Sequence, residues 1–160
     1  MDDLKFMDEA LALARQSAAE GEVPVGCVIV RRGEIVGRGR NRREQVRNAL
    51  SHAEVEAIND ACRTLGGWRL WECTLYVTLE PCPMCAGAIV NARIPRVVYG
   101  ASDDKCGAVR SVCALFDMRF NHHPAVEAGL LEEECKAVLQ EFFKGLRIRL
   151  KDRPKWKPKQ

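Results

Sequence analysis

Residues 74–85 read Thr74-Leu75-Tyr76-Val77-Thr78-Leu79-Glu80-Pro81-Cys82-Pro83-Met84-Cys85, and an apolar run follows over 86–90. The first six residues are β-branched, aromatic or aliphatic, as is typical of a strand. Pro83 fits the first turn of a helix, where its missing N–H costs nothing. The stretch therefore predicts a strand that passes into a helix, with Cys82 and Cys85 on one face of the first helical turn.

Helices and strands alternate on either side of this stretch. Apolar residues at helical spacing predict a helix over 3–20 that ends at Gly21. We expect strands over 23–30 and 34–39, joined by a hairpin at Arg32-Gly33 and followed by a polar loop over 40–50. A helix should then run from Ser51 as N-cap to about Leu65. After residues 74–90 we expect a strand over 97–100, a polar turn over 103–107 and a final amphipathic helix over 131–146. Strands separated by helices predict an α/β protein with helices on the faces of a mixed or parallel sheet.

The size of the chain predicts one domain. Its 160 residues, 47% of them hydrophobic, are enough to bury a core without disulfides. We expect residues 1–150 to form this domain and residues 151–160 a basic tail. No apolar run reaches membrane-spanning length, and the acidic start Met1-Asp2-Asp3 does not resemble a secretory signal. The expected location is the cytoplasm, with no membrane partner.

Positive charge is concentrated towards the C-terminus. Residues 144–160 hold eight lysines and arginines against one aspartate, a net charge of +7; the whole chain carries +3, so the remainder carries −4. A basic segment on a slightly acidic body indicates a polyanionic partner, because lysine and arginine bind phosphates. The alternative is a frayed end that only aids solubility.

The eight cysteines do not indicate a disulfide framework, which is typical of short secreted chains. Several lie in apolar company, as Cys27 does, and free cysteine packs as a small hydrophobic residue. Only Cys82 and Cys85 have the spacing of metal ligands.

One imidazole and two thiolates would complete a catalytic zinc site. His52 can join Cys82 and Cys85 as the third ligand, which leaves the fourth position of a tetrahedron open for water. Both helices are predicted to begin at these ligands, and a helix N-terminus lowers the pKa of a thiol towards the thiolate that zinc requires. Glu54, two residues beyond His52, can move the proton of that water. The sequence therefore predicts one Zn²⁺ per chain and hydrolytic chemistry.

Each part of this pattern also has a simpler explanation. Ser51 and Glu54 match a capping box, in which Glu54 would only cap its own helix. A Cys-x-x-Cys pair can be a redox pair, but the upstream His-x-Glu would then have no role. His122 and His123 are alternative ligands, although Asn121-His122-His123-Pro124 is typical of a surface turn. The combination favours catalytic zinc.

These residues resemble the zinc-dependent nucleoside and nucleotide deaminases, the cytidine and deoxycytidylate deaminase superfamily, and within it the bacterial tRNA adenosine deaminases. The H-x-E and P-C-x-x-C signature is common to the superfamily. The likeness extends over almost the whole chain, through Glu22-Val23-Pro24-Val25-Gly26, Asn41, His52-Ala53-Glu54, 75–88, 96–101, Asp103 with Lys105, Glu134-Cys135 and Phe142-Phe143.

The resemblance implies a three-layer α/β/α, cytidine-deaminase-like fold with a central mixed sheet of about five strands, and a homodimer. It implies conversion of adenosine to inosine at the wobble position of a tRNA anticodon. In that reaction a zinc-activated hydroxide adds at C6, with Glu54 as proton shuttle and His52, Cys82 and Cys85 as the zinc ligands.

The resemblance also implies residues that bind the single-stranded RNA of the anticodon loop. Asn41 would hydrogen-bond the flipped base, while Val25 and Ala53 pack around it. Asp103 and Lys105 would hold the neighbouring nucleotides, and Phe143 and Arg147 would lie near the anticodon loop. Without the resemblance, Asn41 could be a turn residue and Phe143 a core residue.

Several residues depart from the family pattern, and other functions share its zinc site. Asn48-Ala49-Leu50-Ser51 precedes His52 where the family often has Asp-Pro-Thr-Ala, and Cys27, Cys106 and Arg110 are unusual. The nearest alternative is a deaminase of a free base or nucleotide, of the guanine, cytidine or deoxycytidylate type. A non-catalytic zinc module and an enzyme acting on single-stranded DNA are two further alternatives.

Overall fold

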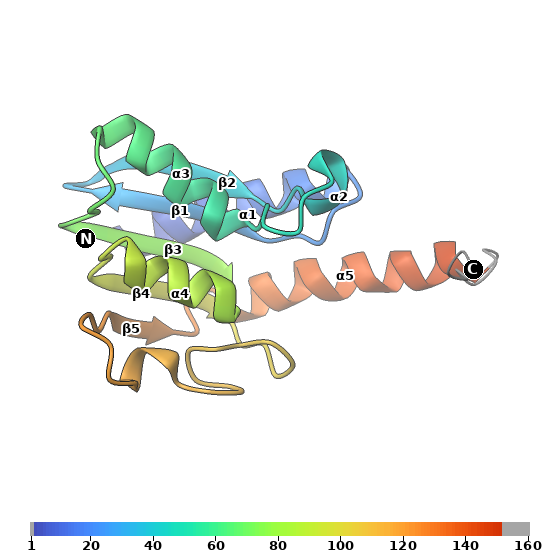
Figure 1. The fold of residues 1–160 in the computed structure, drawn as a ribbon. Coiled ribbons are helices and arrows are strands. Elements are labelled where there is room, and N and C mark those ends of the chain that lie inside the picture. The colour runs from blue at the N-terminus through green and yellow to red at the C-terminus, as the bar shows by residue number, and fades with distance from the viewer. Residues whose placement is uncertain (1, 152–160) are drawn as a thin grey trace, which may run out of the picture.

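The computed structural model describes residues 2–151 as five helices, one 3-10 turn and a five-stranded sheet (Figure 1). Of the predicted basic tail, 152–160 lie outside the described residues. The elements are α1 (Asp3–Ala19), β1 (Gly26–Arg31), β2 (Glu34–Arg40), α2 (Arg43–Val46), α3 (Ala53–Leu65), β3 (Cys73–Leu79), α4 (Pro83–Asn91), β4 (Arg96–Ala101), η1 (Leu115–Asp117), β5 (Ala125–Ala128) and α5 (Glu132–Leu150).

The sheet is mixed, with strand order β2-β1-β3-β4-β5. β1 pairs antiparallel with β2 and with β3, whereas β3, β4 and β5 run parallel. The hairpin predicted at Arg32-Gly33 is confirmed, with positive φ at both residues. Parallel strands need crossovers, and α4 supplies the one between β3 and β4.

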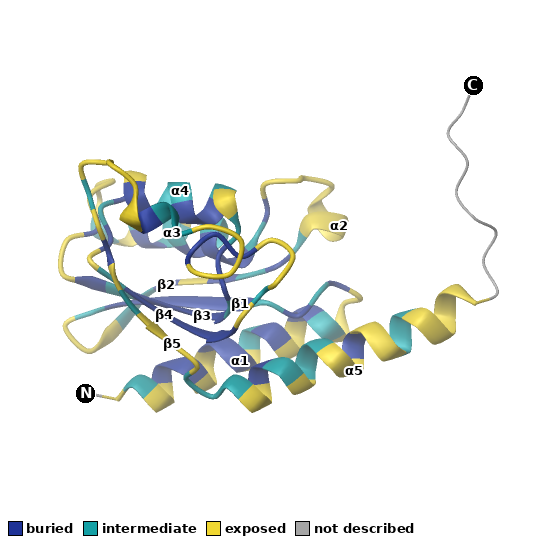
Figure 2. Cartoon of the chain, turned by 90° about the horizontal axis from the view of Figure 1, so that it is seen from below, coloured by how far each residue is buried: buried dark blue, intermediate teal, exposed yellow. Residues whose placement is uncertain are grey.

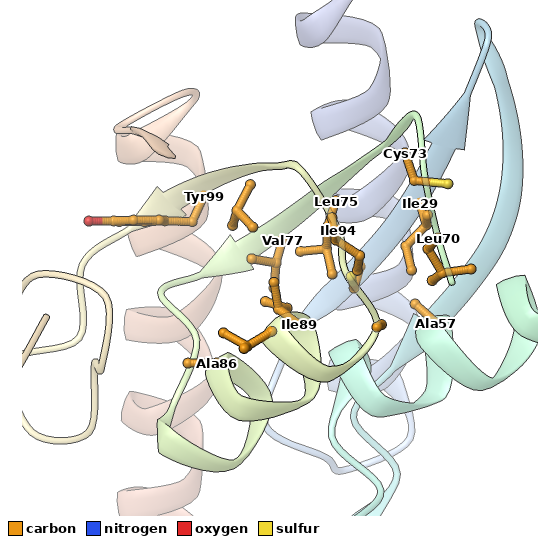
Figure 3. Packing of buried hydrophobic residues seen from close by; sticks show 14 of the residues in the cluster. Ile29, Ala57, Leu70, Cys73, Leu75, Val77, Ala86, Ile89, Ile94 and Tyr99 are labelled. Atoms are coloured by element: carbon orange, nitrogen blue, oxygen red, sulfur yellow. The ribbon is translucent and has the colours of Figure 1, made fainter. Parts of the chain in front are cut away.

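Helices cover both faces of the sheet, which confirms the predicted three layers. α3 and α4 pack on one face, and α1 and α5 on the other (Figure 2). Alternate residues of each strand therefore enter different cores: Leu75 and Val77 of β3 face α3 and α4, and Tyr76 faces α1. Figure 3 shows the first core, where Ile89 and Ala57 meet the strand residues. Within residues 2–151, no helix is long and apolar enough to cross a membrane.

Several elements differ from the prediction: β5 was not predicted from the residue pattern, β4 begins at Arg96 rather than at 97, and α5 ends at Leu150 rather than at 146. β1 begins at Gly26 rather than at 23, because Pro24 has no N–H for the sheet. The loop predicted over 40–50 contains the four-residue helix α2. α3 has its N-cap at His52, one residue later than predicted.

The backbone of α3 lies directly against β2 at Gly39. A Cβ built on Gly39 would be 2.1 Å from the carbonyl oxygen of Ala53 and 2.5 Å from the backbone nitrogen of Ala57. No side chain larger than hydrogen fits this contact unless the helix moves. Gly39 therefore sets the distance between the sheet and the start of α3.

Candidate active site and metal centre

Two helix N-termini meet at the end of strand β3. His52 is the N-cap of α3 and Cys82 the N-cap of α4, and both have extended backbone. Neither N-cap side chain caps its own helix, so both are free to face each other. The partial positive charge of the two helix ends favours anionic ligands and thiolates at this point, as the sequence predicts.

The side chains of His52, Cys82 and Cys85 form a compact set of ligand atoms. His52 Nδ1 lies 3.6 Å from Cys82 Sγ and 3.5 Å from Cys85 Sγ, and all three ligand atoms lie within 4.8 Å of one another. Across residues 2–151 this is the only group of three or more His, Cys, Asp or Glu residues that could hold a metal ion. One nitrogen and two sulfurs with space for a fourth ligand are the donors that catalytic Zn²⁺ prefers.

His122 and His123 take no part in this group. His122 Nε2 lies 2.6 Å from the carbonyl oxygen of Ile94, and His123 Nδ1 lies 2.6 Å from that of Phe116. These contacts attach the segment before β5 to its neighbours, so the two residues have a structural role.

The protonation of the three side chains is strongly coupled. Hydrogen bonds from the Cys85 thiol and from His52 lower the pKa of Cys82 to about 4. The same bond between the thiols, together with burial, raises the pKa of Cys85, and the bond to Cys82 raises that of His52. Cys82 is therefore a thiolate at neutral pH even before a cation binds.

Glu54 is a buried carboxyl at the second position of α3, with 4% of its surface exposed. Burial raises its pKa to about 7, so it can both take and give a proton near neutral pH. The capping-box explanation is wrong, because Ser51 is not the N-cap of the helix.

A cavity of about 620 Å³ opens over these residues. His52, Glu54 and Cys82 line it, and so do six of the seven residues predicted to bind substrate: Val25, Asn41, Ala53, Asp103, Lys105 and Phe143. Arg147, the seventh, is not in the lining; it is exposed on α5, four residues beyond Phe143. Sites for organic ligands commonly have volumes of about 300–1,000 Å³.

Asn41 is held in place by its own amide. Its Nδ2 donates to the carbonyl oxygen of Val23 at 3.2 Å, and its Oδ1 accepts from the N–H of Arg43 at 3.3 Å. An amide has two N–H donors and two acceptor positions, so one of each stays available. Asn41 is 4% exposed, and these two hydrogen bonds fix the orientation of its side chain. The remaining donor and acceptor are available to a ligand in the cavity that Asn41 lines.

Phe143 is not a core residue. It is 39% exposed and lines the cavity, whereas the adjacent Phe142 is 8% exposed and belongs to the core. The two rings make an edge contact with centroids 5.5 Å apart. The C-terminal half of α5, which carries Phe143, extends past the sheet (Figure 2).

Two buried carboxylates, Glu22 and Glu80, have no role in the sequence prediction, and Glu80 lines the cavity. Glu22 accepts hydrogen bonds from the N–H groups of Glu44 and Gln45 at 2.9 and 3.2 Å, and so holds α2. Glu80 holds the loop after β4 in the same way. The one signal available was the position of Glu80 directly before Pro81-Cys82, but its partners lie 23 to 31 residues away in the sequence.

Known proteins resemble this chain over most of its length. The family model of the MafB19-like deaminases matches residues 1–147. The chain is similar to the tRNA-specific adenosine deaminase of Streptococcus pyogenes serotype M1, with 52% identity over 91% of this chain and 86% of that protein.

Solved structures agree with the sequence comparison. One comes from studies of A-to-I editing by tRNA:A34 deaminases at the wobble position of transfer RNA. It has a TM-score of 0.82 and 46% identity over 84% of this chain and 99% of that one. The guanine deaminase of Bacillus subtilis is more distant, with a TM-score of 0.62 and 31% identity over 99% of both chains. The predicted fold is confirmed. By the extent of these likenesses, the chain belongs to the MafB19-like deaminases and, within them, to the family of the bacterial tRNA-specific adenosine deaminases.

Proposed function

We propose that this protein hydrolytically deaminates adenosine to inosine at the wobble position of a tRNA anticodon. The observation that carries the proposal is the grouping of His52, Cys82 and Cys85 with the buried Glu54 beneath one large cavity. The relatives named above give the substrate. Residues 1–150 would form the deaminase domain. The protein would act in the cytoplasm, as enzymes that modify tRNA typically do.

His52, Cys82 and Cys85 are the residues that would hold one Zn²⁺ per chain. Their donor set fits this ion, because two thiolates and an imidazole at two helix N-termini favour a soft divalent cation. When bound, Zn²⁺ acts as a Lewis acid that makes water a nucleophile near neutral pH.

Glu54 would carry the protons of the reaction. Its pKa of about 7 lets the carboxylate accept a proton from the attacking water and return one to N1 of adenine. The carboxylate then takes the remaining proton from the oxygen added at C6 and passes it to the amino group, so that the C6–N bond breaks, ammonia leaves and inosine remains. Because Glu54 is buried, bulk water does not compete for this proton.

Asn41, Val25 and Ala53 would position the base. The free donor and acceptor of Asn41 can pair with the edge of a purine, and Val25 and Ala53 supply apolar walls. A base can reach Glu54 only if it is unstacked, which fits a base in an anticodon loop and not one in a duplex.

Asp103, Lys105, Phe143 and Arg147 would contact the nucleotides on either side. An exposed aromatic ring such as that of Phe143 can stack on an unpaired base, and Lys105 can bind phosphate. Arg43 is an additional cation in the lining, whereas Arg40 is paired with Glu20 at 3.0 Å. Arg147 would act one helical turn beyond the cavity.

An apolar groove lined by residues of α3, of α4 and of the segment after α3 supports a homodimer. The groove has a volume of about 290 Å³ and is lined by Val55, Ile58, Asn59, Cys62, Trp68, Ala88, Asn91 and Ala92. Trp68 is 51% exposed, and α4 contains no charged residue. Apolar surface of this kind is typical of contacts between subunits, and we infer that a second copy of the chain covers it.

Light scattering after gel filtration tests this dimer. We expect the wild type to elute with twice the 17.9 kDa chain mass and Ala88→Arg with the mass of one chain, because the arginine would bury a charge in the interface. Lys136→Glu on α5, outside the groove, is the control and should leave the dimer intact. A monomeric wild type would contradict the inference.

An anticodon stem-loop carrying a wobble adenosine tests the proposed function. We expect the purified protein to form inosine, read as guanosine after reverse transcription, with a rate that falls as salt rises. The same assay should include guanine, cytidine, deoxycytidylate and a single-stranded DNA loop of equal sequence. Turnover of a free base or nucleotide with none of the stem-loop would replace the proposed function by that alternative.

A further inference from the structure

The loop over 102–114 forms one side of the cavity opening and has no regular structure. It contains no helix or strand, yet five of its residues line the cavity: Ser102, Asp103, Asp104, Lys105 and Cys106. Loops of this length are mobile unless specific contacts hold them. The contacts that fix this loop therefore decide how it meets a substrate.

The carboxylate of Glu80 makes most of those contacts. Glu80 is 2% exposed and follows the last residue of β3. Its two oxygens accept five hydrogen bonds from the loop: from the N–H groups of Asp103 (3.1 Å), Val109 (3.1 Å), Arg110 (2.9 Å) and Ser111 (3.0 Å), and from the hydroxyl of Ser111 (2.5 Å).

The loop passes directly over this carboxylate. A Cβ built on Gly107 would lie 2.4 to 2.5 Å from the carboxyl carbon and oxygens of Glu80, so any larger residue there would displace the carboxylate. Among residues 2–151, Glu80 forms no ion pair; its charge is balanced by backbone N–H groups and the hydroxyl of Ser111. Charged acceptors make hydrogen bonds about twice as strong as neutral ones.

Glu80 also connects the loop to the metal ligands. It stands two residues before Cys82, and the carbonyl oxygen of the intervening Pro81 accepts the N–H of Ala108 at 2.8 Å. The segment 103–111 is thus held against the same short turn that carries the ligand. A shift of Glu80 would move Asp103 and Lys105 relative to Cys82.

We propose that Glu80 is a positioning residue, which holds segment 103–111 in the conformation that receives the nucleotides next to the target base. This inference rests on the proposed function. Glu80 takes no proton from the substrate; it acts through the loop. Glu80 therefore contributes to the affinity for the RNA. Because it orders the loop before the substrate binds, the complex does not lose free energy to the conformational entropy of ordering that loop.

The test is Glu80→Gln, which keeps the shape and removes the charge. Its amide has one oxygen acceptor and turns an NH₂ group towards the N–H donors of the loop. We expect the KM for the stem-loop to rise about tenfold, as for loss of a hydrogen bond to a charged group. The kcat should stay within about threefold of the wild-type value and the zinc content should not change. The lost interaction stabilises the bound substrate and the transition state equally, so it affects KM and not kcat. The amides of Val109, Arg110 and Ser111 should exchange with deuterium faster than in the wild type.

Two further variants separate positioning from folding. Ser111→Ala removes only the hydroxyl bond to Glu80 from an exposed residue; it should raise the KM about twofold to fivefold and remain folded even if Glu80→Gln does not. Glu72→Gln is the matched control: Glu72 is exposed at the other end of β3 and pairs with Arg32 at 2.9 Å. It should leave KM and loop exchange unchanged.

A rise in KM together with faster exchange of 109–111 supports the positioning role. An active wild type whose KM and loop exchange are the same in Glu80→Gln and Ser111→Ala overturns it. So does a variant that loses only thermal stability. A wild type without stem-loop activity refutes the proposed function instead, and with it an RNA role for Glu80.

Discussion

Replacing Glu54 by glutamine should reduce kcat on the stem-loop by about 10²–10⁴-fold, the range that general acid–base catalysis contributes. Glutamine has almost the same shape as glutamate but cannot take up or release a proton at neutral pH. The side chain is 4% exposed, so the substitution removes one buried titratable group and leaves the packing of α3 unchanged. Glu54→Ala should be equally inactive. Single-turnover rates of inosine formation measure the effect on the chemical step.

Glu56→Gln is the control on the same helix. Glu56 is half-buried and lies 3.9 Å from Arg42, outside the cavity lining. Its substitution should change kcat by less than about threefold, and both variants should keep their zinc and their circular dichroism spectrum. A Glu54 variant with more than about a tenth of wild-type turnover would contradict the proton-carrying role, since a tenfold effect is below the general-acid range.

Loss of one metal ligand should have an effect at least as large. We expect Cys85→Ala to lower the zinc content well below one ion per chain and kcat by more than about 10³-fold, because Lewis-acid activation is worth several kcal/mol. Cys85 is fully buried, with 0% of its surface exposed. Elemental analysis of the purified variant measures the metal, and inosine formation measures its consequence.

Chelation gives the same test without a substitution. Wild-type protein dialysed against a strong chelator should lose activity and regain it with Zn²⁺ but not with Mg²⁺, which prefers oxygen ligands. For Cys85→Ala, the matched control is Cys113→Ser, because Cys113 is an exposed thiol outside the cavity lining. Full activity in metal-free wild type would refute a catalytic cation.

The sequence predicted the family, the fold and the enzyme class correctly, because their signals are short-range. A strand over 74–79, Pro83 and the Cys-x-x-Cys pair each occupy a few consecutive residues. The alternation of strands and helices then predicted the layers. Only the pairing of His52 with the two cysteines needed a long-range inference, and the known geometry of catalytic zinc supplied it.

What the sequence could not predict depends on distant contacts. Glu22 and Glu80 are acidic residues in short polar segments, and no local pattern shows that they are buried and bonded to loops 22 to 31 residues away. The start of α3 could not be predicted from local sequence either. Ser51 has a strong N-cap propensity, but the helix begins at Ala53, with His52 as its N-cap. The isolated position of Arg147 beyond the cavity follows from the direction of α5, which residue spacing alone does not give.

The contact between Gly39 and Ala53 has a consequence for how this protein can evolve. Ala53 lies between His52 and Glu54 in the sequence. The contact between its backbone and the edge strand β2 therefore sets the distance of His52 and Glu54 from the sheet. Substitutions at surface positions cannot alter that contact. In contrast, a single methyl group added at residue 39 would alter it. The loops over 41–50 and 102–114 are held instead by hydrogen bonds, each to a single buried glutamate. Mutations that change which nucleic acid is accepted should therefore accumulate in these loops and in α5, while the reaction itself stays the same.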